Sequence, residues 1–217
     1  MSIPIIVSYY TEGDRNNFYS KCFTELKKQC EQFSFLHYFE KKNSLKDYHK
    51  NCKQKPKFIL ECLEKFNNPV LFIDIDCILS GNIPVSFLNL INYDIAVAKT
   101  DGLVNDNEKE CSLLSNYNCG DPKNIHIRDG LIFANNTIQA KQFIEQWDSM
   151  CHNTNMSDHM CLDCLVKKNV KQINVKILPA IANTVFNKTI NKNNIINHKE
   201  TFCFYRVSSG HQNLRLE

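Results

Sequence analysis

Two aspartates stand directly after a short apolar run in the first half of the chain. Val70-Leu71-Phe72-Ile73 precedes Asp74-Ile75-Asp76, and Cys77-Ile78-Leu79 restores the apolar character. Because Pro69 and Gly81 bracket this stretch, the pattern predicts one short buried strand over 70–79. Alternate residues of a strand share a face, so the two carboxylates are expected to point the same way.

A buried pair of carboxylates needs a compensating partner. Their desolvation is costly, and two like charges that lie close together raise each other's pKa. A hard divalent cation with oxygen ligands, Mg²⁺ or Mn²⁺, resolves both problems. The alternative is a strand end at which the aspartates cap the next turn. We interpret Asp74 and Asp76 as a metal site.

Length and charge limit the classes of function. The 217 residues, 43% of them hydrophobic, suit a single domain over 1–217 with a sizeable core. The net charge is only +3, which argues against nucleic acid as the main partner. No run approaches the ~20 apolar residues of a membrane span, and the N-terminus lacks the basic region of a signal peptide. We expect a monomer or weak dimer in the cytoplasm, or in the host cytoplasm if the source is viral.

The eleven cysteines are scattered along the chain. Without an export signal they are interpreted as reduced, mostly buried small residues rather than as a disulfide framework. Cys161 and Cys164, with Cys151, His152 and His159 nearby, raise the question of zinc. A structural zinc site normally shows two paired ligand sets, and this segment has one pair inside a helical stripe.

Apolar periodicity predicts alternating strands and helices. Strands are expected at 3–10, 33–39 and 70–79, with helices at 18–30 and 55–66 between them. This order is typical of a mostly parallel sheet with helices on both faces. Beyond it we expect a short helix at 83–88, strands at 93–98, 125–134, 175–178 and 202–205, and helices that start near Thr137 and Asp158. The long loop at 99–123 is expected to be functional or mobile.

Four stretches, in this order, resemble metal-dependent glycosyltransferases of the GT-A fold. Asp74-Ile75-Asp76 resembles the DXD element, and Ser8-Tyr9-Tyr10-Thr11 resembles the tip of the opening strand that holds the nucleoside. Lys55-Pro56-Lys57-Phe58 resembles the helix start before the DXD strand, and Arg128–Asn135 resembles the strand that lines the sugar pocket. The likeness covers roughly residues 3–180. It implies an α/β fold, a three-layer α/β/α sandwich around a mostly parallel, mixed sheet.

The resemblance also implies a donor, a cofactor and a set of binding residues. The donor would be a nucleotide-diphosphate sugar, with a UDP-sugar favoured, and the acceptor a glycan or another hydroxyl compound. Asp76 would contact Mn²⁺ or Mg²⁺ directly, and Asp74 would contact either the ribose or, through a water molecule, the metal. The further ligand is commonly a histidine near the C-terminus, for which His211 and His198 are the candidates. The donor-binding residues would be Ser8, Tyr9, Tyr10, Thr11, Lys55, Asp74, Ile75, Arg128 and Gly130.

Several of these residues have simpler interpretations. Tyr9 or Tyr10 could stack on a base, but whichever ring points inward would be a core aromatic. Lys55 lies at a helix start that favours phosphate, although a solvated lysine is the more usual case. Each candidate histidine could equally be a solvated surface residue.

An inverting transfer needs a base that takes the proton of the acceptor hydroxyl. Asp158 resembles the acidic residue with this role, and its alternative is an ordinary helix N-cap. Asp129 is the second catalytic candidate and could instead bind a sugar hydroxyl. A retaining enzyme would need no such base, so the stereochemical outcome stays open.

Two other functions fit the aspartate pair. In a haloacid-dehalogenase-like phosphatase, Asp74 would be the nucleophile and Asp76 the general acid/base. Ile78 departs from that family's pattern, and its motif normally lies on the first strand. A non-catalytic binder of nucleotide sugars or glycans is the third possibility. Manganese-dependent release of nucleoside diphosphate distinguishes the three.

Overall fold

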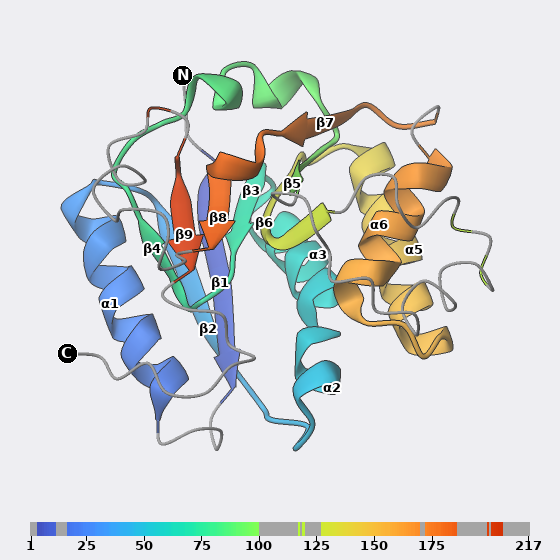
Figure 1. The fold of residues 1–217 in the computed structure, drawn as a ribbon, viewed down its shortest axis with the longest axis horizontal. Helices are drawn as coiled ribbons and strands as arrows, with labels where there is room; N and C mark the ends of the chain where they lie inside the picture. Colours follow the sequence, from blue (N-terminus) through green and yellow to red (C-terminus); the bar gives the residue numbers. More distant parts are fainter. Residues whose placement is uncertain are drawn as a thin grey trace.

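The structure is a computed structural model that describes residues 4–11, 17–99, 117, 119, 127–169, 172–185, 199 and 201–205. Its elements follow the alternating order expected from the sequence (Figure 1). The helices are α1 (Phe18–Gln32), α2 (Tyr48–Cys52), α3 (Lys55–Phe66), α5 (Ile138–Asn153) and α6 (Asp158–Asn169), with 3₁₀ turns η1 (Val85–Phe87), η2 (Leu90–Asn92) and η3 (Ala180–Ala182). The strands are β1 (Ile5–Thr11), β2 (His37–Lys42), β3 (Val70–Ile73), β4 (Cys77–Leu79), β5 (Ile95–Lys99), β6 (Ile127–Ala134), β7 (Val175–Leu178), β8 (Asn183–Val185) and β9 (Cys203–Tyr205).

Six strands form one mixed sheet in the order β2-β1-β3-β6-β5-β7. The pairs β1–β2, β1–β3 and β5–β7 are parallel, whereas β6 runs antiparallel to both of its neighbours. The carboxyl ends of β1 and β3 therefore meet the beginning of β6 at one edge of the sheet. A smaller sheet, in the order β4-β9-β8, shares no strand with the large one.

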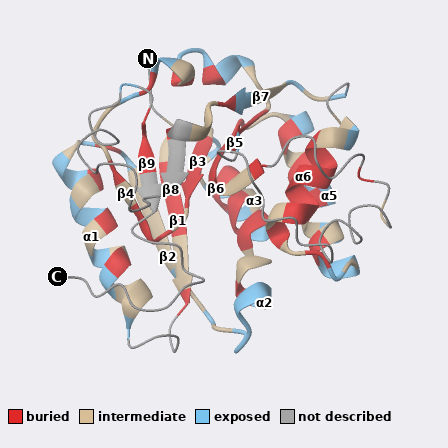
Figure 2. Cartoon of the chain, viewed as in Figure 1, coloured by how far each residue is buried: buried red, intermediate tan, exposed pale blue. Residues whose placement is uncertain are grey.

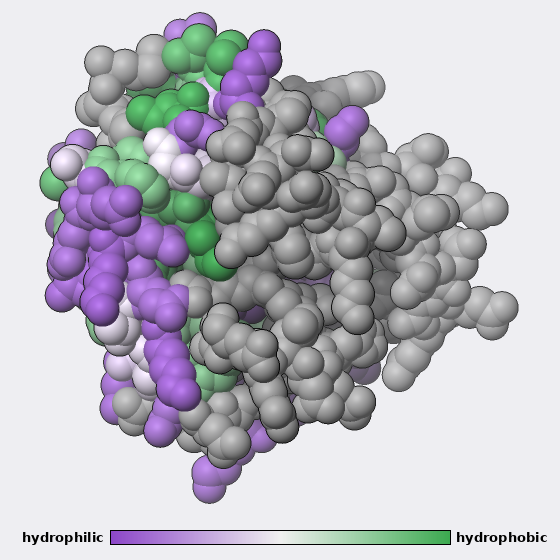
Figure 3. Space-filling model, turned by 60° about the vertical axis from the view of Figure 1, so that its left-hand side comes forward, coloured by the Kyte–Doolittle hydropathy of each residue, from purple (hydrophilic) through white to green (hydrophobic). Residues whose placement is uncertain are grey.

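Helices cover both faces of the large sheet, which confirms the α/β sandwich (Figure 1). Alternation along β3 divides the core in two, because Val70 and Phe72 pack on the side of α3, α5 and α6. Leu71 and Ile73 pack on the side of α1 and the small sheet. Figure 2 shows that buried residues line the strands and the inner sides of these helices. The outer side of α1 is largely hydrophilic (Figure 3).

The helix starts behave as the sequence predicts. Pro56 lies in the first turn of α3, where its missing N–H costs nothing. Thr137 caps α5, because its Oγ1 accepts a hydrogen bond from the N–H of Ala140 at 3.1 Å. Thr137 also donates to Asp94 Oδ1 at 2.6 Å, which ties the beginning of α5 to the start of β5.

The predicted single strand over 70–79 is wrong. The chain leaves the large sheet after Ile73, turns at 75–76 and enters the small sheet as β4. The N–H of Asp74 donates to Gly130 O at 3.0 Å, and the N–H of Cys77 donates to Asp74 O at 3.0 Å. Asp74 thus begins the turn and Asp76 lies within it, so the two residues do not alternate along one strand.

Three other segments also differ from the sequence prediction. The strand expected at 33–39 begins only at His37 and continues to Lys42, because Phe33 and Ser34 form the turn that ends α1. The polar segment before Lys55 contains the short helix α2, whose N-cap Asp47 accepts from Lys50 N at 2.8 Å. The short helix expected at 83–88 is a single 3₁₀ turn.

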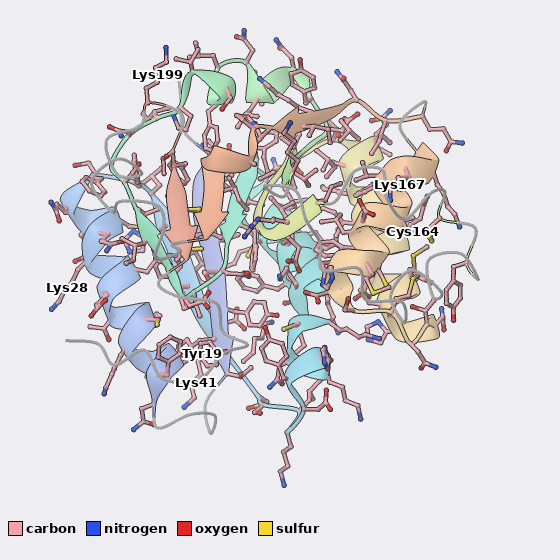
Figure 4. All side chains as sticks on the ribbon, in the orientation of Figure 1. Tyr19, Lys28, Lys41, Cys164, Lys167 and Lys199 are labelled. Carbon is pink, nitrogen blue, oxygen red and sulfur yellow. A yellow bond between two sulfur atoms is a disulfide. The ribbon has the colours of Figure 1, made fainter. Side chains whose placement is uncertain are left out.

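The cysteines are not all reduced as expected. Cys119 and Cys164 form a disulfide with a sequence separation of 45 (Figure 4). The other described cysteines are free, and all of them except Cys52 are buried. In the described part of the chain, no group of three or more His, Cys, Asp and Glu side chains is arranged to hold a metal ion. Cys164, one of the residues considered for zinc, is part of the disulfide.

Candidate active site

A buried lysine lies at the centre of the predicted site. Lys55 is the first residue of α3 and is only 4% exposed. Its Nζ lies 2.6 Å from Asp129 Oδ2, 3.2 Å from Asp74 Oδ1 and 3.2 Å from Asp158 Oδ2. The same Nζ lies 5.4 Å from the centre of the Phe72 ring, which forms an apolar wall. One ammonium group therefore contacts carboxylates from three other segments, and we call these four residues the Lys55 cluster.

The topology explains why the cluster forms. Asp74 follows the end of β3, and Asp129 lies near the beginning of the antiparallel neighbour β6. Asp158 is the first residue of α6, which packs against β6 and α5. The cluster therefore occupies the edge where β3 ends and where β6, α3 and α6 begin.

Burial and charge shift the pKa values within the cluster in opposite directions. Burial alone would lower the pKa of Lys55, but Asp129, Asp74 and Asp158 raise it well above its usual value. Burial would raise the pKa of Asp129, but Lys55, a hydrogen bond from Asp158 and the charge of His159 together lower it. Burial and the charge of Asp129 raise the pKa of Asp158 well above its usual value, despite Lys55. The pKa of Asp129 is thus lowered and that of Asp158 raised, so Asp158 is the member of the pair that keeps a proton more readily.

The residues at the tip of β1 have different surroundings. Tyr9 points inward, since its ring lies 5.3 Å from Phe58 and its hydroxyl donates to Asn51 O at 2.7 Å. Its position agrees with the alternative of a core aromatic that anchors α2. Tyr10 is half-buried and packs on Phe23 with ring centres 5.0 Å apart.

The other predicted donor residues lie along the same edge. Ser8 is wholly buried, and its hydroxyl has no hydrogen-bond partner within the described residues. Thr11 and Ile75 are 7% and 6% exposed. Arg128 and Gly130 flank Asp129 on β6, where the Gly130 carbonyl accepts from the N–H of Asp74.

The chemistry of the aspartate pair fits a hard dication, although the structure shows no complete site. Asp76 is a buried carboxylate, 5% exposed, at the turn, and one oxygen of Asp74 already contacts Lys55. Carboxylate oxygens are suitable ligands for Mg²⁺ or Mn²⁺. Any further protein ligand would have to come from elsewhere, and His198 and His211 lie outside the described residues.

Sequence reasoning named every member of the Lys55 cluster but not their mutual contacts. It treated Lys55 as a phosphate ligand or a solvated lysine, because a lysine before proline carries no signal of burial. The ionic contacts to Asp129 and Asp158 span long sequence distances that periodicity does not report.

The mixed six-stranded sheet with helices on both faces is consistent with a glycosyltransferase of the GT-A type. The sequence profile of the nucleotide-diphospho-sugar transferase family matches residues 16–206. The chain therefore belongs to the nucleotide-diphospho-sugar transferase family.

A solved structure has the same fold. It is the crystal structure of a glycosyltransferase involved in the glycosylation of the major capsid of PBCV-1, with a TM-score of 0.65 and 15% sequence identity. The alignment covers 96% of this chain and 95% of that one. No curated protein matches the sequence. Within the described part of the chain, no helix combines the length and apolar character needed to cross a membrane.

Proposed function

We propose that this glycosyltransferase moves a sugar from a nucleotide-diphosphate sugar, with UDP as the favoured nucleotide, to a hydroxyl group of a glycan or other acceptor. Family membership supports the sugar transfer. The observation that carries the proposal is the Lys55 cluster, which gathers three carboxylates at the edge of the sheet. We further propose that residues 1–217 act as one domain.

We propose that Asp74 and Asp76 hold the Mn²⁺ or Mg²⁺ ion of this reaction. When bound, such an ion supplies positive charge to the diphosphate that leaves the sugar. Asp76 would be the direct ligand, since Lys55 already contacts one oxygen of Asp74. His211 or His198 would complete the protein ligands.

The donor would lie along the edge formed by β1, the turn after β3, and β6. Arg128 would bind a phosphate, since its guanidinium can form two parallel hydrogen bonds to phosphate oxygens. Ser8, Tyr10 and Thr11 would contact the nucleoside, and the unpartnered Ser8 hydroxyl supports a polar group there. Tyr9 would contribute indirectly by holding α2 in place, because its hydroxyl donates a hydrogen bond to Asn51 O on that helix.

Asp129 would accept hydrogen bonds from hydroxyl groups of the donor sugar. Its lowered pKa keeps it ionised, which suits an acceptor of hydrogen bonds. Lys55 would hold Asp74 and Asp129 in place, so that neither carboxylate has to be reoriented when the donor binds. A fixed polar arrangement of this kind stabilises charge without reorganisation during the reaction.

Asp158 would be the general base of an inverting transfer. Its carboxylate takes the proton of the acceptor hydroxyl while the acceptor oxygen bonds to the anomeric carbon. The bond from that carbon to the diphosphate oxygen breaks in the same step, and the diphosphate leaves with the electron pair. Because burial raises the pKa of Asp158, turnover is expected to increase with pH as its base form becomes populated.

A panel assay tests the proposal. Purified protein is incubated with nucleotide sugars and either Mn²⁺, Mg²⁺ or a chelator, and the release of nucleoside diphosphate is measured. We expect release with at least one donor and its loss in the chelator and in Asp76→Asn, but not in the control Asp148→Asn on α5, a residue outside the Lys55 cluster. Phosphate release from an aryl phosphate would instead indicate the phosphatase, and neither activity would indicate a binding module.

A further inference from the structure

The only tryptophan of the chain contacts the backbone of the proposed base. Trp147 lies on α5, and its side chain is wholly buried in the core between α3, α5 and α6. Its indole Nε1 donates a hydrogen bond of 2.9 Å to the carbonyl oxygen of Asp158. Both partners are buried, so water does not compete for this bond.

The bond adds a constraint that the helix itself does not require. Asp158 begins α6, and a carbonyl in the first turn of an α-helix already accepts from the N–H four residues later. A buried indole N–H needs a partner, but here the partner is the main chain of a residue in the Lys55 cluster. The indole therefore fixes where the first turn of α6 sits against α5.

Asp158 is thus held at two points. Trp147 holds its carbonyl from one side, while its carboxylate contacts Lys55 at 3.2 Å on the other. Together the two contacts determine the direction in which the carboxylate faces. Without the indole bond, the first turn of α6 could move relative to α5 while the contact between Lys55 and the Asp158 side chain stayed formed.

We propose that Trp147 is a positioning residue for the transfer reaction and sets the orientation of the Asp158 carboxylate toward the acceptor hydroxyl. The inference rests on the proposed role of Asp158 as the base. Misplacement of a reacting group by 1 Å can cost about 10²-fold in rate. Loss of the indole bond alone should shift the group by less, so we expect kcat to fall roughly tenfold. The KM for the donor should change less than about twofold, because the hydrogen bond of Trp147 goes to Asp158, which is assigned to the acceptor and not to the donor.

The test uses residue-specific replacement of tryptophan by benzothienylalanine, in which sulfur replaces the indole N–H and the ring shape is kept. Because the chain has one tryptophan, only position 147 changes. The replacement is made in the native sequence and in Asp158→Asn, and kcat and KM are measured for both. Trp147→Phe provides a second comparison, with Phe143→Leu as its control, since Phe143 is buried in the same core on α5 and has no polar group.

The double-mutant cycle separates positioning from general stability. We expect the analogue to lower kcat in the native sequence and to cost nothing further in Asp158→Asn. The inference is overturned if the analogue lowers kcat equally in both backgrounds, or does not lower it in the native sequence. It is also overturned if Trp147→Phe and Phe143→Leu lower kcat by the same factor. If Asp158→Asn itself keeps full turnover, the base assignment fails first, and the inference fails with it.

Discussion

Lys55 Nζ lies 2.6 Å from Asp129 Oδ2, although the two residues are 74 positions apart in the chain. The same Nζ also lies 3.3 Å from the Asp129 carbonyl oxygen, so both the side chain and the backbone of Asp129 face the ammonium group. This contact joins the first turn of α3 to the beginning of β6. The arrangement of the proposed active site therefore depends on one buried cation.

Replacement of Lys55 by methionine should remove both activity and stability. Lys55→Met keeps the aliphatic stem but leaves three carboxylates around an uncharged side chain. Removal of one partner from a buried ionic group typically costs about 3–5 kcal/mol. We expect a clear fall in Tm by calorimetry and loss of sugar transfer.

Lys57→Met is the matched control for Lys55→Met. Lys57 lies two residues further along the same helix start and is exposed. Surface substitutions usually change the free energy of unfolding by no more than about 0.5 kcal/mol. Equal Tm and equal turnover in the two variants would contradict the central position of Lys55.

Asp158→Asn should reduce catalysis and leave donor binding intact. General-base catalysis typically contributes about 10²–10⁴-fold to the rate, and an amide cannot take the proton. Turnover is measured under saturating donor, and nucleotide affinity by calorimetric titration. Asp163→Asn serves as a control, since Asp163 is buried on the same helix and pairs with Lys167 at 2.7 Å. Full turnover in Asp158→Asn would exclude the base role.

The raised pKa of Asp158 predicts how stability depends on pH. Above the usual aspartate pKa of about 3.9, the unfolded chain releases this proton while the folded protein keeps it. The free energy of unfolding of the native protein should therefore decrease as pH rises, until Asp158 ionises in the folded state. Lys55, Asp129 and Asp74 are the charged groups that face it.

Asp158→Asn provides the comparison, because its amide has no carboxyl proton that could be released on unfolding. Its free energy of unfolding minus that of the native protein should increase with pH from about 4 upward. Denaturant unfolding curves at a series of pH values measure this difference. A difference that stays constant or decreases would show that Asp158 does not hold its proton in the folded protein.

The sequence patterns predicted which elements form and which residues carry the chemistry of the site. They predicted less well how these residues are arranged in space. The apolar run before Asp74 correctly marked a central strand, but the same run continued through Cys77-Ile78-Leu79 and concealed the turn into the second sheet. A change of sheet leaves no mark on hydrophobicity when both strands are buried. Pro56 and Thr137 marked helix starts correctly, because caps and first turns depend on local chemistry.

The contacts that assemble the site could not be predicted in this way. The burial of Lys55 follows from carboxylates supplied by β6 and α6, far along the chain. The bond from Trp147 to Asp158 likewise depends on how α5 packs against α6. The disulfide between Cys119 and Cys164 was missed because eleven scattered cysteines show no pairing pattern.

Removal of that disulfide should destabilise the fold. Cys119→Ala with Cys164→Ala opens a link across 45 positions, for which the chain-entropy relation gives about 4 kcal/mol. We expect a reductant to lower the Tm of the native protein but not that of the double variant. Cys62→Ala, at a buried free cysteine, should keep the native response to reductant. A native Tm that reductant leaves unchanged would contradict a stabilising disulfide.

Calorimetric titration of UDP into the native protein, Asp76→Asn and Asp148→Asn, each with and without Mn²⁺, tests the proposed metal-dependent binding of the donor most directly. We predict that UDP binds the native protein and Asp148→Asn only when Mn²⁺ is present, and that Asp76→Asn loses this metal-dependent binding. Equal UDP affinity with and without Mn²⁺ in the native protein, or unchanged Mn²⁺-dependent binding in Asp76→Asn, would contradict the account.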